Sequence, residues 1–121
     1  MTYEYHATVL RVVDGDTLDL DVDLGFHIHV QQRVRLAGIN APEHTTDAGR
    51  AALEKLSALL MTTEIGVLFP KVTINSQKPP RFEKYGRWLA DVTTSYGESV
   101  SELMLASGHA QPWDGKGKRP V

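Results

Sequence analysis

The segment of residues 18–24 alternates strictly between apolar residues and aspartate. A period of two places successive side chains on opposite faces of a strand, so this pattern predicts a half-buried β-strand over residues 17–24 rather than a helix. Gly25 predicts a hairpin bend, and flanking strands are expected over residues 5–13 and 27–37. Four apolar side chains of the central strand are expected to face the core: Leu18, Leu20, Val22 and Leu24.

Two groups of side chains on these strands could suggest metal binding. The aspartates at 19, 21 and 23 invite a calcium-loop interpretation, but an EF-hand would require Gly in place of Leu24 and Glu in place of Val30. His27 and His29 share one face of the third strand, yet no third ligand is evident in the sequence. We therefore interpret both histidines as exposed strand residues.

The pattern changes to a helical period after the third strand. An amphipathic helix is expected over residues 47–61, with Thr46 or Asp47 as its N-cap. Further strands are expected at 65–74 and 86–92. A capping-box pattern at Ser99 opens a second helix through about Ser107, with Gly108 as its stop. Five strands with a helix inserted after the third indicate a small closed barrel.

Composition narrows the class of protein. The chain has 121 residues, no Cys and 41% hydrophobic residues, which predicts one soluble domain over residues 1–121, with a flexible tail at 112–121. The absence of Cys excludes thiolate metal sites and redox chemistry. The N-terminus has neither a basic segment nor an apolar signal core, so we expect a cytoplasmic protein. No apolar run is long enough to cross a membrane, so no membrane contact is expected. We also expect a monomer. A phage-encoded protein and a processed secreted form are alternatives.

Three charged motifs carry the chemical signal: Val13-Asp14-Gly15-Asp16-Thr17, Arg35 to Glu43, and Lys84-Tyr85-Gly86-Arg87. Together they offer oxygen ligands for a hard cation, guanidinium groups for phosphate and a carboxylate to accept a proton. Asp-Gly alone is an ordinary tight-turn signal, but the second carboxylate of Asp16 adds repulsion that a simple turn does not need. Pro42 restricts the preceding residue to extended geometry and helps to fix the direction of Glu43.

With these motifs in this order, the chain resembles the staphylococcal nuclease (thermonuclease) family over about residues 5–113. The resemblance implies an α+β, mainly β fold: a five-stranded OB-type barrel with two to three packed helices. It also implies a calcium-dependent nuclease that hydrolyses phosphodiester bonds of DNA and RNA by in-line attack of water. The implied cofactor is Ca²⁺.

The resemblance assigns a role to each motif residue. Asp16 would bind Ca²⁺ directly, together with the side-chain oxygen of Asn40 and the backbone carbonyl of Ala41, while Asp14 would lie in the outer shell. Glu43 would activate or orient the attacking water. Two arginines and two neighbouring residues would hold the phosphate and substrate: Arg35, Arg87, Tyr85 and Lys84.

Two positions depart from the family pattern. Asn40 stands where the family usually has an acidic ligand, so one negative charge is lost and weaker metal binding is expected. Trp113 stands where a base-stacking Tyr is often found, and it could either stack on a nucleobase or close the edge of the barrel.

The formal net charge is only −2, so a basic stripe rather than the whole protein would attract nucleic acid. Its candidate members precede Arg87 or lie in the tail: Lys71, Lys78, Arg81, Lys84, Lys116, Lys118 and Arg119. The alternative is a solvated loop and a frayed tail. A second alternative concerns the whole protein, because domains with this barrel also occur as catalytically weak or inactive modules that bind nucleic acid or protein. The presence of both arginines and Glu43 favours the enzyme.

Overall fold

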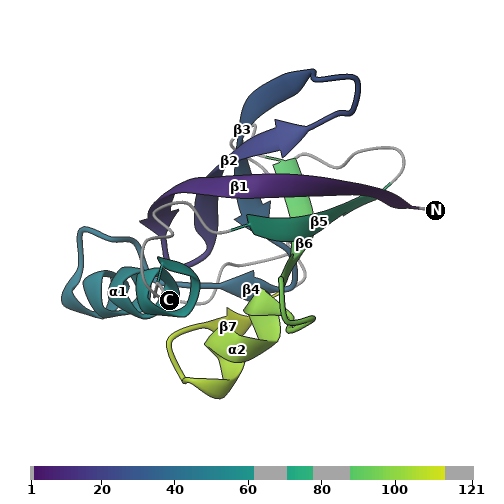
Figure 1. Cartoon of the computed structure of the whole chain (residues 1–121). Coiled ribbons are helices and arrows are strands. Elements are labelled where there is room, and N and C mark those ends of the chain that lie inside the picture. The colour runs from purple at the N-terminus through teal and green to yellow at the C-terminus, as the bar shows by residue number, and fades with distance from the viewer. Residues whose placement is uncertain (1, 62–70, 78–87, 114–121) are drawn as a thin grey trace.

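The computed structural model describes residues 2–61, 71–77 and 88–113 (Figure 1). These ranges contain seven strands and two helices. In chain order the elements are β1 (Thr2–Asp14), β2 (Thr17–Asp23), β3 (His29–Leu36), β4 (Ile39–Asn40), α1 (Asp47–Met61), β5 (Lys71–Gln77), β6 (Trp88–Thr94), α2 (Val100–Ala106) and β7 (Gln111–Pro112).

Five strands form a closed barrel in the order β1, β2, β3, β6, β5, and β5 pairs back onto β1. Neighbouring strands are antiparallel except β3 and β6, which are parallel and pair Val34 with Trp88. The remaining strands, β4 and β7, form a separate two-stranded sheet. The expected mainly β, OB-type barrel is confirmed. Neither helix in the described ranges has the length and apolar character needed to cross a membrane.

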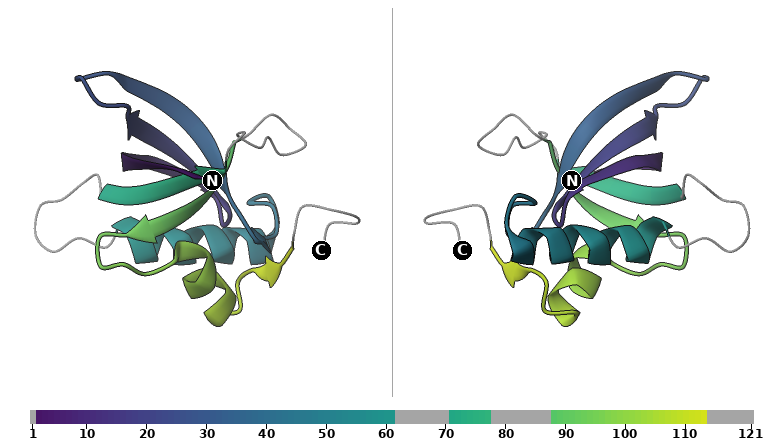
Figure 2. Two further views of the ribbon diagram at one scale, coloured as in Figure 1. Left: turned by 90° about the vertical axis from the view of Figure 1, so that its right-hand side faces the viewer. Right: turned by 90° about the vertical axis from the view of Figure 1, so that its left-hand side faces the viewer.

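The two helices lie together at one end of the molecule, and the tip of the β2–β3 hairpin projects away from them (Figures 1 and 2). The first three apolar side chains of β2 are buried in the barrel, as the alternating pattern predicts: Leu18, Leu20 and Val22. Leu24 lies on the same face, at the mouth of the barrel, but it is 46% exposed, so its predicted place in the core is wrong. It follows the last residue of β2, where the hairpin extends beyond the closed part of the barrel.

The loop that joins β2 to β3 is longer than the sequence indicates. Gly25, Phe26 and His27 all have positive φ angles, and the Leu24 N–H donates to the Ile28 carbonyl across the loop at 2.8 Å. Gly25 is thus the predicted bend. However, β3 begins at His29, so the expected strand position of His27 is wrong because its backbone is left-handed.

Both helices begin where their sequences predict. α1 spans the expected residues 47–61, and the hydroxyl of Thr46 accepts a hydrogen bond from the Gly49 N–H at 3.0 Å, which makes Thr46 the N-cap. The buried face of α1 contains Ala52, Leu56 and Leu60. α2 is capped by Ser99 and is followed by Gly108, as predicted.

The last two expected strands are found with shifted bounds. β5 ends three residues later than expected, and β6 continues two residues further than expected. The first parts of both predictions, 65–70 and 86–87, lie outside the described residues, as does most of the predicted tail, 114–121. Within the described part of that tail, Pro112 pairs with Ile39.

Candidate functional site

Three polar side chains from the charged motifs are almost completely buried: Asp16 is 1% exposed, Arg35 2% and Asn40 2%. Strand pairing brings them together. The register of β2 and β3 places Thr17 opposite Arg35, and the Leu36 N–H donates to the backbone carbonyl of Asp16 at 2.8 Å. Two of the predicted motifs therefore meet below the surface at one end of β3.

Hydrogen bonds join these side chains into one cluster. Asp16 Oδ1 accepts from the Thr17 hydroxyl at 2.8 Å, while Oδ2 accepts from the Ala41 N–H at 2.9 Å and from Arg35 Nη2 at 3.4 Å. The same Nη2 donates to Asn40 Oδ1 at 3.0 Å. A buried charge is tolerated only when it is paired, and removal of one partner costs about 3–5 kcal/mol. The cluster is thus a fixed arrangement of charges.

Trp113 lies directly over this cluster. Its ring centroid is 4.8 Å from the Arg35 guanidinium carbon, and its backbone N–H donates to the Gly38 carbonyl at 3.0 Å. The side chain is half-buried. A guanidinium stacked on an indole ring is a cation–π contact, which helps to fix the orientation of Arg35. The structure therefore places Trp113 at the site that the motifs predict.

Asp14 holds the segment that follows Asn40. Its Oδ1 accepts from the His44 backbone N–H at 2.9 Å and lies 2.7 Å from His44 Nδ1. The sequence motifs did not single out His44. No local signal identifies it, because the contact joins residues thirty positions apart.

The backbone of Glu43 is fixed by the start of α1. Its carbonyl accepts from the Thr46 N–H at 3.0 Å and from the Thr46 hydroxyl at 2.8 Å. Gly49 packs against the same carbonyl so closely that a Cβ there would lie 1.6 Å from the oxygen. The Glu43 side chain itself is exposed. Thus an exposed carboxylate is carried on a rigid backbone beside the buried cluster.

Gly15 separates the two aspartates of the first motif for a steric reason. A Cβ at this position would lie 2.6 Å from the Ala52 Cβ on α1 and 2.9 Å from the Ala41 Cβ. The sequence therefore predicted the position of the turn correctly, but it did not show that packing against α1 and Ala41 also requires glycine here. Gly15 allows α1 and the Ala41 segment to approach the β1–β2 turn.

The other residues predicted to bind substrate fall in a part of the chain that the structure does not describe. These are Lys84, Tyr85 and Arg87, together with Lys78, Arg81, Lys116, Lys118 and Arg119. Of the proposed basic stripe, Lys71 is described, and it is exposed at the start of β5.

The acidic face of β2 is paired with basic side chains of neighbouring strands. Asp19 accepts a 2.8 Å hydrogen bond from Arg33, and Asp21 lies 3.2 Å from His29. The bond from Arg33 holds the pKa of Asp19 below its ordinary value, against the opposing effect of partial burial, and Asp19 raises the pKa of Arg33. These charges are satisfied within the sheet, which agrees with the rejection of a calcium loop.

The oxygen donors of the buried cluster suit calcium in type. Ca²⁺ prefers carboxylate, amide and backbone carbonyl oxygens, and Asp16, Asn40 and Ala41 offer one of each. Over residues 2–61, 71–77 and 88–113, no group of three or more His, Cys, Asp or Glu side chains could hold a metal ion. A Ca²⁺ ion at the cluster would therefore have to use the amide and carbonyl oxygens beside one carboxylate, and it would compete with Arg35 for Asp16 Oδ2 and Asn40 Oδ1.

Comparison with known proteins agrees with the motifs. The sequence model of the family described as "Staphylococcal nuclease homologue" matches residues 33–118, more than half of the chain. An "Uncharacterized endonuclease" of Escherichia coli O157:H7 is 28% identical over 118 residues, which cover 98% of this chain and 67% of that protein. The "Micrococcal nuclease" of Shigella flexneri is 33% identical over 89 residues, or 74% of this chain and 42% of the relative. "Endonuclease YhcR" of Bacillus subtilis (strain 168) is 35% identical, with 88% of this chain matching 9% of its length.

Proposed function

The chain belongs to the staphylococcal nuclease homologue family, and from this premise we propose that it is a calcium-dependent nuclease that hydrolyses phosphodiester bonds of DNA and RNA. The observation that carries the proposal is the buried cluster of Asp16, Arg35 and Asn40. Apolar residues of similar volume would often stabilise a core as well as a buried ion pair does. The cost of burying these charges is therefore better explained by a function than by stability. The names of the relatives support the same reaction class.

In the proposed mechanism Arg35 binds the phosphate through the edge of its guanidinium. Nη2 is held by Asp16 and Asn40, and Trp113 covers the face, so the orientation of the guanidinium is set before substrate arrives. A preorganised donor stabilises the negative charge that grows on the phosphate oxygens during attack. Arg87, outside the described residues, is proposed as the second phosphate ligand, and Tyr85 and Lys84 as substrate contacts.

Glu43 is proposed to accept a proton from the attacking water. Its side chain is exposed, and its backbone is anchored by Thr46 and by the close approach of Gly49. A general base contributes most when its position is fixed relative to the water it activates. Asp14 would support this arrangement through its two contacts with His44, next to Glu43 in the chain.

Calcium would be held by Asp16, the Asn40 side-chain oxygen and the Ala41 carbonyl, with Asp14 further out. When bound, the ion supplies positive charge that stabilises the developing charge on the phosphate. The hydrogen bond from Arg35 to Asn40 Oδ1 occupies one of the lone pairs that this oxygen offers. This contact favours a second candidate function, a catalytically weak module that binds nucleic acid or protein.

The test is hydrolysis of single-stranded DNA, duplex DNA and RNA by the purified chain, with Ca²⁺ and with a chelator. We expect Ca²⁺-dependent cleavage that falls by about 10²–10⁴-fold in Glu43→Gln. Glu54→Gln is the matched control, because Glu54 is an exposed carboxylate on α1. Tight nucleic-acid binding without cleavage would reject the enzyme and favour the binding module. An unchanged rate in Glu43→Gln would reject Glu43 as the base.

A further inference from the structure

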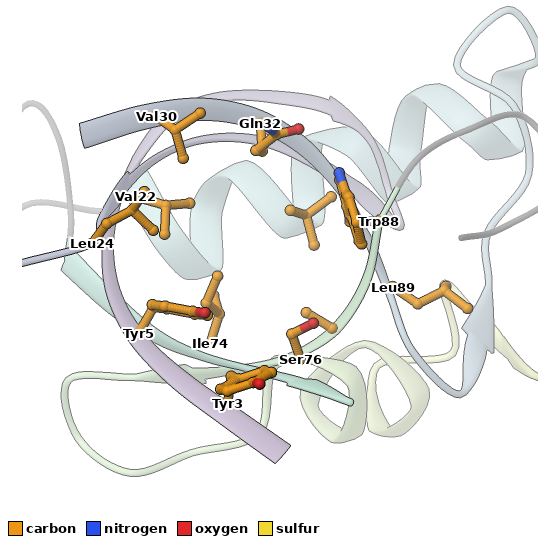
Figure 3. A pocket seen from close by; sticks show the side chains of 12 residues that line it. Tyr3, Tyr5, Val22, Leu24, Val30, Gln32, Ile74, Ser76, Trp88 and Leu89 are labelled. Carbon is orange, nitrogen blue, oxygen red and sulfur yellow. The ribbon is translucent and has the colours of Figure 1, made fainter. Parts of the chain in front are cut away.

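A cavity of about 220 Å³ opens at the end of the barrel formed by the starts of β1, β3 and β6 and the ends of β2 and β5. Figure 3 looks into it and shows most of the labelled side chains arranged around an open centre, whereas Leu89 lies outside this ring, beyond β6. The cavity is open to solvent on one side, so its apolar walls face water when it is empty. Covering apolar surface by an occupant is favourable, and this gives a physical reason for a ligand.

The described side chains that line the cavity offer no partner to a charged ligand. All twelve described side chains around it are aliphatic, aromatic, Gln or Ser, and none carries a charge. An ion moved into such surroundings loses its hydration without gaining a partner. Gln32 and Ser76 provide a small number of polar atoms, which is the usual composition of a site for a small organic molecule.

The volume of the cavity and the aromatic residues on its wall further restrict the kind of ligand that would fit. An apolar cavity of about 150 Å³ holds one benzene ring, so the present one has room for a ring system somewhat larger than benzene. Three aromatic residues lie on its wall: Tyr3, Tyr5 and Trp88. The rings of Tyr3 and Tyr5 are tilted by 34°, with centroids 6.3 Å apart. Planar aromatic ligands gain most from such surroundings through offset and edge-to-face contacts.

The cavity is separate from the buried polar cluster. Val34 lines the cavity, whereas its neighbour Arg35 belongs to the cluster, and successive strand residues point to opposite faces. A nucleobase whose phosphate is bound at Arg35 would have to cross the sheet to enter the cavity. Tyr3 and Leu24 are partly exposed at the rim and give a free molecule access from solvent.

We propose that this barrel-mouth cavity binds a small uncharged aromatic molecule of one or two fused rings, free in solution. The proposal is independent of the nuclease activity, since none of the described lining residues has a role in that mechanism. Indole is a suitable probe because it is planar, bicyclic and neutral.

The experiment is a titration of isotope-labelled protein with indole, followed by NMR. We expect saturable shifts at submillimolar indole, including the side-chain N–H of Trp88. The side-chain N–H of Trp113, which packs on Arg35, should stay in place and serves as the internal control. Indole-3-carboxylate should bind at least about tenfold more weakly, because none of the twelve described lining side chains is a cation.

Two phenylalanine variants test the location. Val30→Phe directs a ring into the cavity and should weaken indole binding by at least about tenfold, whereas Gln31→Phe, on the outer face of the same strand, should bind as the wild type does. Both should retain the circular dichroism spectrum and any nuclease activity of the wild type. If Val30→Phe does not fold, Ser76→Leu takes its place.

Three results would overturn the proposal. The first is the absence of saturable binding up to the solubility of indole, and the second is equal affinity in wild type and in the filled variant. The third is displacement of indole by a single-stranded oligonucleotide, which would identify the occupant as a base of a bound strand and not as a free molecule.

Discussion

Gly49→Ala tests whether the start of α1 determines the position of Glu43. Gly49 lies within the first turn of α1, where alanine is ordinarily the better helix former by about 1 kcal/mol. In this fold a Cβ at position 49 would lie 1.6 Å from the Glu43 carbonyl oxygen and 2.2 Å from its carbon. Ordinary contact begins at 3.4 Å, so the oxygen would have to move by 3.4 − 1.6 = 1.8 Å.

Such a movement breaks contacts whose cost can be estimated. The Glu43 carbonyl would lose the hydrogen bonds from the Thr46 N–H and hydroxyl, each worth about 0.5–1.5 kcal/mol. Overpacking adds roughly 1–3 kcal/mol, which is offset in part by the helix propensity of alanine. Together these terms predict that the free energy of unfolding falls by about 1–5 kcal/mol.

The assay is denaturant unfolding followed by circular dichroism. Ala58→Gly, at an exposed position of the same helix, is the control for propensity alone and should lose about 1 kcal/mol. Nuclease activity of Gly49→Ala, measured where the variant is fully folded, should also fall, because Glu43 moves with its carbonyl. A gain in stability of about 1 kcal/mol would refute the reasoning, since it would mean that helix propensity alone decides the outcome.

Three further predictions follow from other contacts. Asn40→Asp should tighten Ca²⁺ binding measured by calorimetry, because it restores a negative charge beside Asp16. Phe26→Asn should raise the free energy of unfolding by about 0.5–1 kcal/mol, because Asn tolerates the φ of +54° better and Phe26 is 95% exposed. The pKa of Asp19 is lowered in the folded protein, so its ionised carboxylate should contribute to stability, by at most about 1 kcal/mol for this exposed pair with Arg33. This contribution is present above the unperturbed pKa of 3.8 and is lost as the pH falls through the pKa of the folded state.

Each of these has a control and a contradicting result. Looser or unchanged Ca²⁺ binding in Asn40→Asp would show that residue 40 is not a ligand. Ile28→Asn, in the same loop at a position whose φ is not positive, should not stabilise the protein. A loss of stability in Phe26→Asn would contradict the argument from backbone strain. Asp19→Asn should lack the acid-dependent loss, and an acid profile identical to that of the wild type would contradict the assignment to Asp19.

Much of the candidate site could be read from local sequence. The motifs containing Asp16, Arg35 and Asn40 predicted that these residues act together, and the structure joins them by hydrogen bonds. The sequence did not predict that Arg35 would be 2% exposed, because an alternating arginine on a strand is usually solvated. His44 was also missed, since its contact with Asp14 exists only after the chain folds back on itself.

Elements with local signals can be predicted from the order of the residues alone. The bounds of α1, the cap of α2 and the bend at Gly25 follow from periodicity, side-chain hydrogen bonds to the backbone and glycine conformations, all of which act over a few residues. Local interactions of this kind need no knowledge of the rest of the chain.

Which segments meet depends on the folded chain as a whole. The exposure of Leu24 depends on where the barrel ends, and the need for glycine at 15 and 49 depends on α1 and the Glu43 carbonyl approaching from elsewhere in the chain. The parallel pairing of β3 with β6 depends likewise on barrel closure. Packing and burial are properties of surfaces brought together over long sequence separations, and a local pattern contains no record of the partner surface.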